Sequence, residues 1–348
     1  MLYFNEWSGW MSKNVNRKIL LASRPKGMPE ASNFDIIESN IPEISEGEVL
    51  IRTIYLSVDP YMRGRMSDAK SYAKPYEVGE PFIGGMVGEI VESKNPRFQK
   101  GQYVEGRLEW AEYNVSDGST IRKVNPELAP ITTALHVLGM PGLTAYFGLM
   151  FIGQPKEGET VVVSGASGAV GTIVGQIAKL KGCRVVGIAG ADDKCSFLTE
   201  ELGFDSAINY KTVENLRKAL KEVCPSGVDV YFDNVGGKVS DAVMTLINFQ
   251  SRTAICGQIS QYNLEKPEIG PRIAGQLLTT SSLMKGFIVS DYAEHNKEGL
   301  IQLSKWVKEG KIQYRENIVE GFENTVEAFL GLFRGDNIGK QLVKVAEE

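Results

Sequence analysis

Hydrophobic positions along this chain change their spacing near residue 140. Before that point they fall in short, β-branched segments bounded by Gly and Pro, at residues 48–55, 85–91 and from 103 onward. This pattern is typical of a mostly antiparallel β region. After residue 140, continuously apolar segments alternate with segments of helical periodicity. The alternation predicts a parallel sheet covered by helices on both faces, which is a doubly wound α/β fold.

The predicted elements divide the chain into two domains. Predicted strands in the second half cover residues 160–163, 184–188, 206–210, 228–232, 252–256 and 285–289. Predicted helices between them cover residues 170–181, 197–202, 213–223 and 238–246. Residues 321–330 carry a helical apolar stripe before a strand-like segment, so the tail is assigned to the β-rich domain. We expect a β-rich domain of residues 12–138 and 309–348, a doubly wound domain of residues 139–308, and residues 1–11 as a leader or disordered start.

A run of small residues, 164–171 (SGASGAVG), directly follows the strand at 160–163 and opens a helix. Small residues there let the backbone approach a pyrophosphate, whose charge is stabilised by the free N–H groups of the helix N-terminus. The pattern G-x-G-x-x-G requires glycine where this chain has Ala166, so the match is A-x-G-x-x-G with an additional Gly165. Its place in a βαβ series predicts a dinucleotide site that includes Gly168 and Gly171.

The end of the next strand indicates which dinucleotide binds. Residues 188–191 (IAGA) lack the Asp or Glu that binds the ribose 2′-hydroxyl of NAD, and Lys194 follows shortly after. A 2′-phosphate needs both room and a cation, so we expect NADP(H), with Lys194 at the phosphate. Asp192 and Asp193 oppose this interpretation, and a solvated lysine at a helix start is the alternative for Lys194.

Composition narrows the classes of partner. The 348 residues include 38 Lys and Arg against 43 Asp and Glu, a net charge of −5 without long blocks of one sign. This excludes nucleic acid or an anionic membrane as the expected main partner, and no segment has the ~20 apolar residues of a membrane span. Four scattered Cys and two His fit neither a disulfide framework nor a metal site, so a reducing, cytoplasmic environment is expected.

Six blocks, in one order along the chain, resemble the zinc-independent medium-chain dehydrogenases/reductases. They are Leu56–Gly64, Gly139–Tyr146, Gly165–Gly171, Phe232–Gly237, Cys256–Asn263 and Asn337–Lys340. Within that superfamily the chain is most similar to the leukotriene B4 dehydrogenase, prostaglandin reductase and alkenal double-bond reductase group, over nearly its whole length from about residue 16. The resemblance implies a Rossmann domain for NADP(H), a GroES-like substrate domain and a homodimer joined through the nucleotide domains.

The chain departs from the zinc alcohol dehydrogenases at both places where they carry catalytic metal ligands. Residues 57–61 contain no Cys, and residues 82–89 contain no His. Zinc-assisted alcohol oxidation is therefore not expected, because no Lewis acid polarises the oxygen. The resemblance implies instead NADPH-dependent reduction of the carbon–carbon double bond of α,β-unsaturated aldehydes or ketones. A zinc-free NADPH quinone oxidoreductase and a non-catalytic NADP-binding protein are the alternatives.

Hydride addition to the β-carbon leaves an enolate, which a phenol can hydrogen-bond and protonate. By resemblance, Tyr262 is the tyrosine beside the nicotinamide and the substrate carbonyl, so it is the predicted catalytic residue. Whether it donates the proton or only orients the oxygen stays open, and packing over its loop is the structural alternative. Tyr55, Tyr61 and Arg63 flank the missing metal site and are expected, with Tyr262, to line the substrate pocket.

The resemblance also assigns cofactor contacts along the second half of the chain. They are Thr144, Gly168, Val170, Gly171, Lys194, Tyr210, Asn234, Cys256, Phe287, Val289 and Asn337. The alternative role of Tyr210 is that of a buried tyrosine at a strand end. The alternative role of Asn234 and Asn337 is to form a turn. Phe287 and Val289 lie in an apolar segment, so packing is expected of their side chains. Residues 286–289 are predicted as the last strand of the parallel sheet, and an exposed edge strand favours pairing with a second copy.

Overall fold

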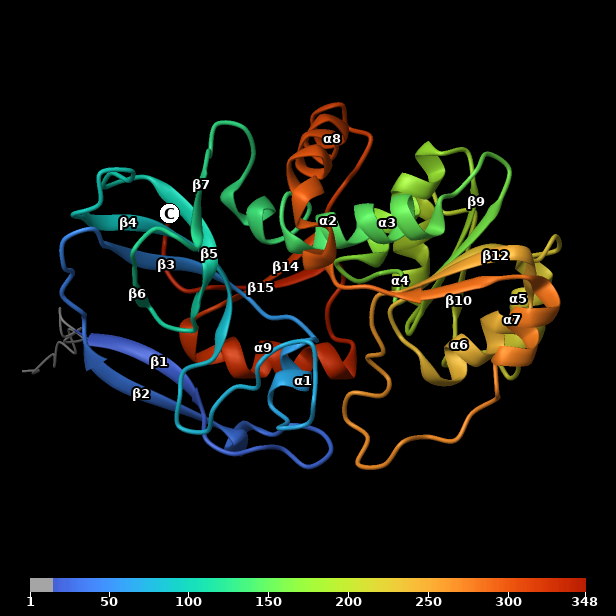
Figure 1. Ribbon diagram of the computed structural model, residues 1–348, viewed down its shortest axis with the longest axis horizontal. Helices are drawn as coiled ribbons and strands as arrows, with labels where there is room; N and C mark the ends of the chain where they lie inside the picture. Colours follow the sequence, from blue (N-terminus) through green and yellow to red (C-terminus); the bar gives the residue numbers. More distant parts are fainter. Residues whose placement is uncertain (1–14) are drawn as a thin grey trace, which may run out of the picture.

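The computed structural model describes residues 15–348, which form a β-rich half and an α/β half side by side (Figure 1). The leader expected over residues 1–11 lies outside the described residues. Among residues 15–348, no helix combines the length and the apolar character needed to cross a membrane. The boundaries at residues 138/139 and 308/309 stay predictions.

Six parallel strands form the sheet of the α/β half, in the order β10-β9-β8-β11-β12-β13. They are β8 (Thr160–Ser164), β9 (Arg184–Ala189), β10 (Ser206–Asn209), β11 (Val228–Asp233), β12 (Ile247–Ile255) and β13 (Leu283–Gly286). The order reverses between β8 and β11, so the carboxyl ends of these two strands define the position where ligands of doubly wound sheets bind. The predicted doubly wound fold is confirmed.

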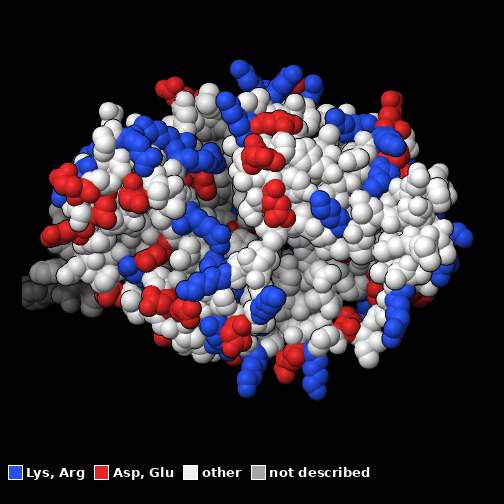
Figure 2. Space-filling view, viewed as in Figure 1, with Lys and Arg blue, Asp and Glu red and all other residues white. Residues whose placement is uncertain are grey.

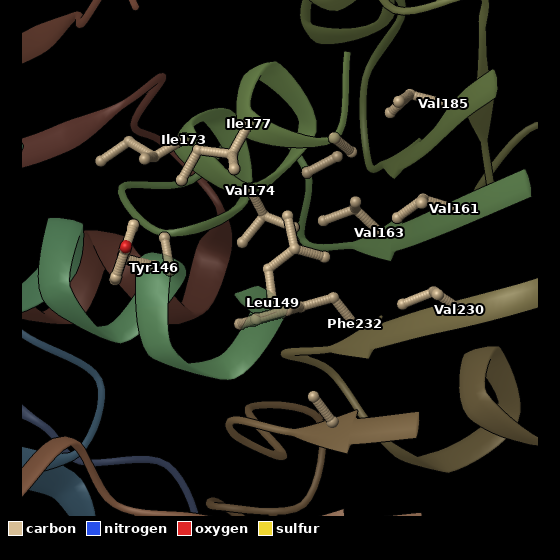
Figure 3. Close-up of a cluster of buried hydrophobic side chains, with 14 of the residues drawn as sticks. Tyr146, Leu149, Val161, Val163, Ile173, Val174, Ile177, Val185, Val230 and Phe232 are labelled. Carbon is tan, nitrogen blue, oxygen red and sulfur yellow. The ribbon is translucent and has the colours of Figure 1, made fainter. Parts of the chain in front are cut away.

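Helices cover both faces of this sheet. They are α2 (Met140–Phe147), α3 (Gly171–Leu180), α4 (Asp192–Ser196), α5 (Leu216–Val223), α6 (Gly237–Met244), α7 (Ala274–Thr280) and α8 (Asn296–Lys308). Short π or 3₁₀ helices continue or precede some of them, at Gly148–Gly153, Phe197–Glu201 and Val289–His295. Alternate residues of each strand face opposite sides, so Val161 and Val163 pack with α2 and α3 while Val162 packs with α5 and α6. Figure 3 shows the first of these cores, where Ile173 and Ile177 of α3 lie over the sheet.

The β-rich half is built on a seven-stranded sheet in the order β14-β15-β3-β4-β5-β7, with β6 also paired to β3. Its strands are β3 (Val49–Ser57), β4 (Ile83–Ser93), β5 (Tyr103–Glu109), β6 (Tyr113–Ser116), β7 (Ile121–Val124), β14 (Glu316–Glu320) and β15 (Lys340–Lys344). A separate pair, β1 (Val15–Leu21) and β2 (Phe34–Asn40), is antiparallel. Because β15 pairs antiparallel with β3, the last strand lies in the same sheet as strands from the first part of the chain.

Two helices complete the β-rich half, α1 (Met62–Arg65) and α9 (Thr325–Arg334). Single 3₁₀ turns lie at Ala31–Asn33, Ile131–Leu135 and Phe322–Asn324. The α9 residue Phe329 is fully buried and packs its ring edge-on against Trp110, 6.0 Å between centroids. This aromatic core anchors the helix that precedes the last strand.

The structure differs from the predicted boundaries of several elements, among them β12, which begins at Ile247 rather than at residue 252. The last parallel strand is β13, so Phe287 lies beyond it and Val289 opens a 3₁₀ helix instead of ending a strand. Ladder pairing with β12 ends at Gly286, and an apolar run alone does not reveal where such pairing stops. The helix predicted from residue 213 begins at Leu216, because the Asn215 side chain caps it by accepting the Lys218 N–H. The helix predicted from residue 197 begins five residues earlier, at Asp192.

Candidate active site

The glycine-rich loop at the end of β8 has the geometry of an anion site. Gly165 has φ +57°, and a Cβ at Gly171 would lie 2.4 Å from the Gly165 carbonyl oxygen. Only glycine at position 171 therefore lets the first turn of α3 approach the loop this closely. The Gly168 N–H donates to the Gly165 carbonyl, which closes a tight turn before the helix. Residues 165–171 thus lead directly into the N-terminus of a ten-residue helix, which is where the motif predicts a pyrophosphate.

Hydrogen bonds between β8 and β11 fix the side chain of Asn234 beside this loop. The Ser164 hydroxyl donates to Asp233 Oδ1 at 2.8 Å, and Asn234 Nδ2 donates to the Ser164 carbonyl at 2.8 Å. The β carbon of Asn234 would lie 3.3 Å from a Cβ at Gly165. Asn234 therefore lies at the topological switch point, next to the predicted cofactor loop.

Two lysines lie close together beyond the end of β9. Lys194 in α4 is 9% exposed, and its Nζ donates to the Gly335 carbonyl at 2.6 Å. Its pKa is lowered chiefly by burial, and the charge of Lys211 acts in the same direction. A Cβ at Gly190 would lie 3.2 Å from the side chain of Lys211 and 3.1 Å from that of Tyr210. Gly190 thus allows Tyr210 and Lys211 to pack closely against the end of β9, and Lys211 lies near enough to Lys194 to lower its pKa. Two ammonium groups and a phenol near one another fit an adenosine 2′-phosphate.

The sequence did not single out Lys211. The only signal for it was its place directly after Tyr210, and its proximity to Lys194 depends on how the ends of β9 and β10 pair.

Other predicted cofactor residues have their side chains engaged within the protein. The Thr144 hydroxyl donates to the Met140 carbonyl of its own helix, and Asn337 Nδ2 donates to the Gly339 carbonyl across a turn. The Phe287 ring lies 6.2 Å from that of Phe232 in the core, as expected for a packing side chain. Cys256 follows β12, and burial raises the pKa of its thiol to about 12, so this sulfur is no thiolate near neutral pH.

Tyr262 lies on the loop that follows β12, at the carboxyl edge of the parallel sheet. Its hydroxyl oxygen accepts the Gln258 N–H at 3.1 Å, which leaves the phenolic proton available for a ligand. A Cβ at Gly257 would lie 3.0 Å from this oxygen, so the loop folds closely around the phenol. Burial raises the pKa of Tyr262, while the Gln258 N–H acts in the opposite direction. The hydroxyl is a neutral donor throughout the physiological range.

The loop that carries Tyr262 is attached to the β-rich half through Arg63 of α1. Arg63 is 6% exposed, its Nε donates to Asn263 Oδ1 at 3.0 Å, and its Nη2 donates to the Gly27 carbonyl at 2.8 Å. Figure 1 shows this loop, between β12 and α7, descending beside α1. Arg63 thus braces the Tyr262 loop with its head group rather than facing open space.

A second phenol, which the sequence did not single out, lies near this group. Tyr72 is 63% exposed, yet its pKa is raised chiefly by burial and also by the nearby Cys256. Arg107 lowers the pKa of Tyr72 and also lies over the ring of Tyr61, 5.6 Å from its centroid. Tyr61 and Tyr72 thus both lie near Arg107, and Tyr72 lies near enough to Tyr262 to raise its pKa.

Tyr55 lies in a different part of the protein from these residues. It packs in a small separate core with Val87 and Leu342, and its hydroxyl donates to Glu348 Oε1 at 3.1 Å. The structure therefore does not bring Tyr55 together with Tyr61, Arg63 and Tyr262. Adjacency in sequence placed it with them, but side chains of a strand alternate between its two faces.

The surface charge and the side chains that could ligate a metal ion indicate which ligands the site can bind. Figure 2 shows acidic and basic side chains interspersed over the viewed face, without an extended field of one sign. Within residues 15–348, no three His, Cys, Asp or Glu side chains converge in a way that could hold a metal ion. The loop after β3 offers Ser57 and Asp59, and Asp59 is paired with the ammonium of Lys340. These donors do not fit a catalytic zinc site.

Comparisons with known proteins match both halves of the chain. The family described as "N-terminal domain of oxidoreductase" matches residues 17–124, and "Zinc-binding dehydrogenase" matches residues 169–306. The putative NADP-dependent oxidoreductase YfmJ of Bacillus subtilis is 55% identical over 95% of this chain and 98% of its own length. The NADPH-dependent curcumin reductase of Escherichia coli is 46% identical over 96% and 98%, and the NADP⁺-dependent 2-alkenal reductase of Nicotiana tabacum is 43% identical over the same shares.

A solved structure is similar over the same extent. CurA from Vibrio vulnificus, in complex with NADPH, is 48% identical and superposes with a TM-score of 0.91 over 95% of this chain and 100% of its own. Fold and site together define a two-domain oxidoreductase with a doubly wound nucleotide domain. The chain belongs to the zinc-independent group of the medium-chain dehydrogenase/reductase family.

Proposed function

We propose that this chain uses NADPH to reduce the carbon–carbon double bond of α,β-unsaturated aldehydes and ketones. The observation that carries the proposal is the position of Tyr262, a neutral phenol at the carboxyl edge of the sheet whose proton is free for a ligand. The printed activities of the relatives, a curcumin reductase and a 2-alkenal reductase, support the same class of substrate.

The residues present fit NADP(H). The loop at 165–171 would hold the pyrophosphate, and Lys194 with Lys211 would hold the 2′-phosphate, beside Tyr210. By resemblance, Thr144, Val170, Asn234 and Cys256 would surround the nicotinamide end, with the backbone at Phe287, Val289 and Asn337. The NADPH complex of the similar structure supports this choice of cofactor. When bound, the cofactor supplies the hydride.

Negative charge develops on the carbonyl oxygen of the substrate as its β-carbon is reduced. A hydroxyl that already accepts one hydrogen bond is polarised toward donating its own, so the Gln258 N–H strengthens Tyr262 as a donor to that oxygen. Proton transfer to the α-carbon completes the reduction, either from this phenol or from water. Tyr61 and Tyr72 would frame the substrate and Arg63 would hold the Tyr262 loop in place, whereas Tyr55 is left out because Glu348 engages its hydroxyl.

Turnover of an α,β-unsaturated ketone compared with a simple quinone, under excess NADPH, tests the proposal. We expect the enone to be reduced at its double bond, with the saturated ketone as product, and with the higher kcat/KM. Faster reduction of the quinone would favour a zinc-free quinone oxidoreductase. Tight NADPH binding without turnover of either substrate would favour a non-catalytic binding protein.

We infer further that the enzyme is a homodimer in a reducing, cytoplasmic environment. The edge position of β13 and the exposure of Leu283 and Leu278, at 49% and 81%, support pairing of two nucleotide domains. The four cysteines are free thiols, which supports the reducing compartment.

A further inference from the structure

Lys340, the first residue of β15, has its ammonium group enclosed in the protein. The residue is 2% exposed, and Nζ donates to the Val58 carbonyl at 2.8 Å, to Asp59 Oδ1 at 3.0 Å and to the Gln341 carbonyl at 3.0 Å. A lysine ammonium has three donors, and three oxygens accept them here. Lys340 therefore has no free N–H for a substrate, and its role is to hold the groups around it.

Two of these oxygens belong to the loop that leads into α1. Asp59 is 5% exposed, its Oδ2 accepts the Ser57 hydroxyl, and its carbonyl accepts the Met62 N–H at 3.1 Å. The Met62 bond starts α1, and the next residue of that helix is Arg63. A change in the position of Asp59 is thus passed to Arg63, and through Asn263 to the Tyr262 loop.

The backbone beside Lys340 contacts the cofactor loop. The Gly339 N–H donates to the Ser167 carbonyl at 2.8 Å, and Gly339 forms a bridge with Gly168. A Cβ at Gly339 would lie 2.0 Å from the Arg315 carbonyl oxygen, so the main chain is tightly enclosed at this point. Residues 339 and 340 therefore contact the glycine-rich loop through the backbone and the α1 loop through one side chain.

We propose that Lys340 is a positioning residue, whose buried cation sets the distance between the substrate-side loop 57–63 and the cofactor loop 165–168. The inference rests on the proposed function for its kinetic consequence, but not for its structural one. The side chain acts on the substrate side only, because the contacts of Gly339 with Ser167 are made by the main chain. Loss of the ammonium should therefore harm use of the enone and leave NADPH binding unchanged.

The test begins with Lys340→Met, which keeps the length of the side chain and removes its charge. The buried carboxylate of Asp59 then has no cation, so we expect Tm to fall by about 5 °C or more. We expect kcat/KM for the enone to fall by roughly 10- to 100-fold, and the Kd of NADPH to stay within about twofold. A kcat/KM within twofold of the parent, or a loss of NADPH affinity that accounts for the whole kinetic effect, would overturn the proposal.

Two further variants separate positioning from simple loss of stability. Lys340→Met combined with Asp59→Asn removes the unpaired charge, so it should recover Tm while kcat/KM stays low, because the contact with Val58 is still missing. Arg252→Met breaks a half-buried pair with Glu159 at the opposite, amino-terminal edge of the sheet, so it should lower Tm and leave kcat/KM unchanged. Kinetic recovery in the double variant, or an equal kinetic loss in Arg252→Met, would reduce Lys340 to a structural role.

Hydrogen exchange gives a readout that needs no turnover. In Lys340→Met, amides of residues 57–66 should exchange faster than in the parent, while those of β9 should not change. If the parent fails to reduce enones but this local effect is present, the proposed function is wrong and the role of Lys340 stands. If exchange at residues 57–66 is unchanged, the proposed role of Lys340 is wrong, whichever substrate the enzyme reduces.

Discussion

Arg63 and Asn263 join the two halves of the molecule beside Tyr262. Arg63 Nε donates to Asn263 Oδ1 at 3.0 Å, and Asn263 directly follows Tyr262. Arg63 is buried without a carboxylate partner among the ion pairs of residues 15–348, and burial lowers its pKa. The position of the Tyr262 phenol thus depends on a residue of the other half.

Removing the acceptor should release the Tyr262 loop. We expect Asn263→Ala to lower kcat/KM for an enone by roughly 3- to 30-fold, because a charge-assisted hydrogen bond is lost and the phenol is less well oriented. NADPH affinity should stay within about twofold, since the cofactor loop at 165–171 is untouched. Steady-state kinetics and NADPH titration measure the two effects.

Asn263→Asp is the matched control, because it keeps an oxygen acceptor for Arg63 at the same position. It should retain most of the parent activity. Equal losses in Asn263→Ala and Asn263→Asp would mean that the bond to Arg63 does not position the loop.

Lys194 should determine the preference of the protein for NADPH over NADH. Lys194→Ala removes a cation expected at the 2′-phosphate, so NADPH affinity should fall by roughly 10- to 100-fold more than NADH affinity. The hydrogen bond from Lys194 to the Gly335 carbonyl is lost whichever cofactor binds. The difference between the changes in NADPH and NADH affinity therefore reports the 2′-phosphate alone. Lys194→Arg should keep most of the preference for NADPH. Equal weakening of both cofactors would remove Lys194 from the phosphate site.

The edge strand β13 should join two copies. Light scattering at micromolar concentration should give twice the 38.3 kDa mass of one chain. Leu283→Lys places a charge on that edge and should shift the mass toward the monomer. Ile301→Lys, on exposed α8, should leave the dimer intact. A monomeric parent protein would contradict this prediction.

The hydrophobic pattern was sufficient for the architecture, because a buried parallel strand must be apolar along its whole length. The central strands β8, β9 and β11 were therefore predicted to within a residue or two. The end of β13 was not, since residues 287–289 are apolar for another reason, the packing of Phe287 on the core. Residues beyond the end of a strand can pack in the same apolar environment as residues within the strand.

Site residues that come from different elements were harder to predict from the sequence. Lys211, Tyr72 and Lys340 were not singled out, because each acquires its role from a partner far away in sequence, such as Asp59 for Lys340. Tyr55 was placed with the substrate residues by proximity along the chain, but its hydroxyl meets the C-terminal Glu348. Motifs made of consecutive residues, such as 165–171, do not depend on such long-range contacts.

The pH dependence of the reaction should reflect the raised pKa of Tyr262. Burial moves this pKa above the ordinary value of 10.0, and the donating form is the protonated one, so activity should persist on the alkaline side. We expect kcat with saturating substrates to show no decline from deprotonation of this phenol below about pH 10. A decline with a midpoint below about pH 9 that disappears in Tyr262→Phe would contradict the buried, neutral donor.

Substitution of Tyr262 by Phe, followed by the rate of hydride transfer to an enone in a single turnover, tests the proposed mechanism most directly. The ring still packs, while the hydroxyl that Gln258 polarises is removed. We predict a fall in this rate of about 10²- to 10³-fold, or roughly tenfold if water or a cofactor hydroxyl shares the oxygen, with NADPH affinity unchanged. Hydride transfer at the parent rate would show that Tyr262 does not stabilise the developing charge, and that another group must do so.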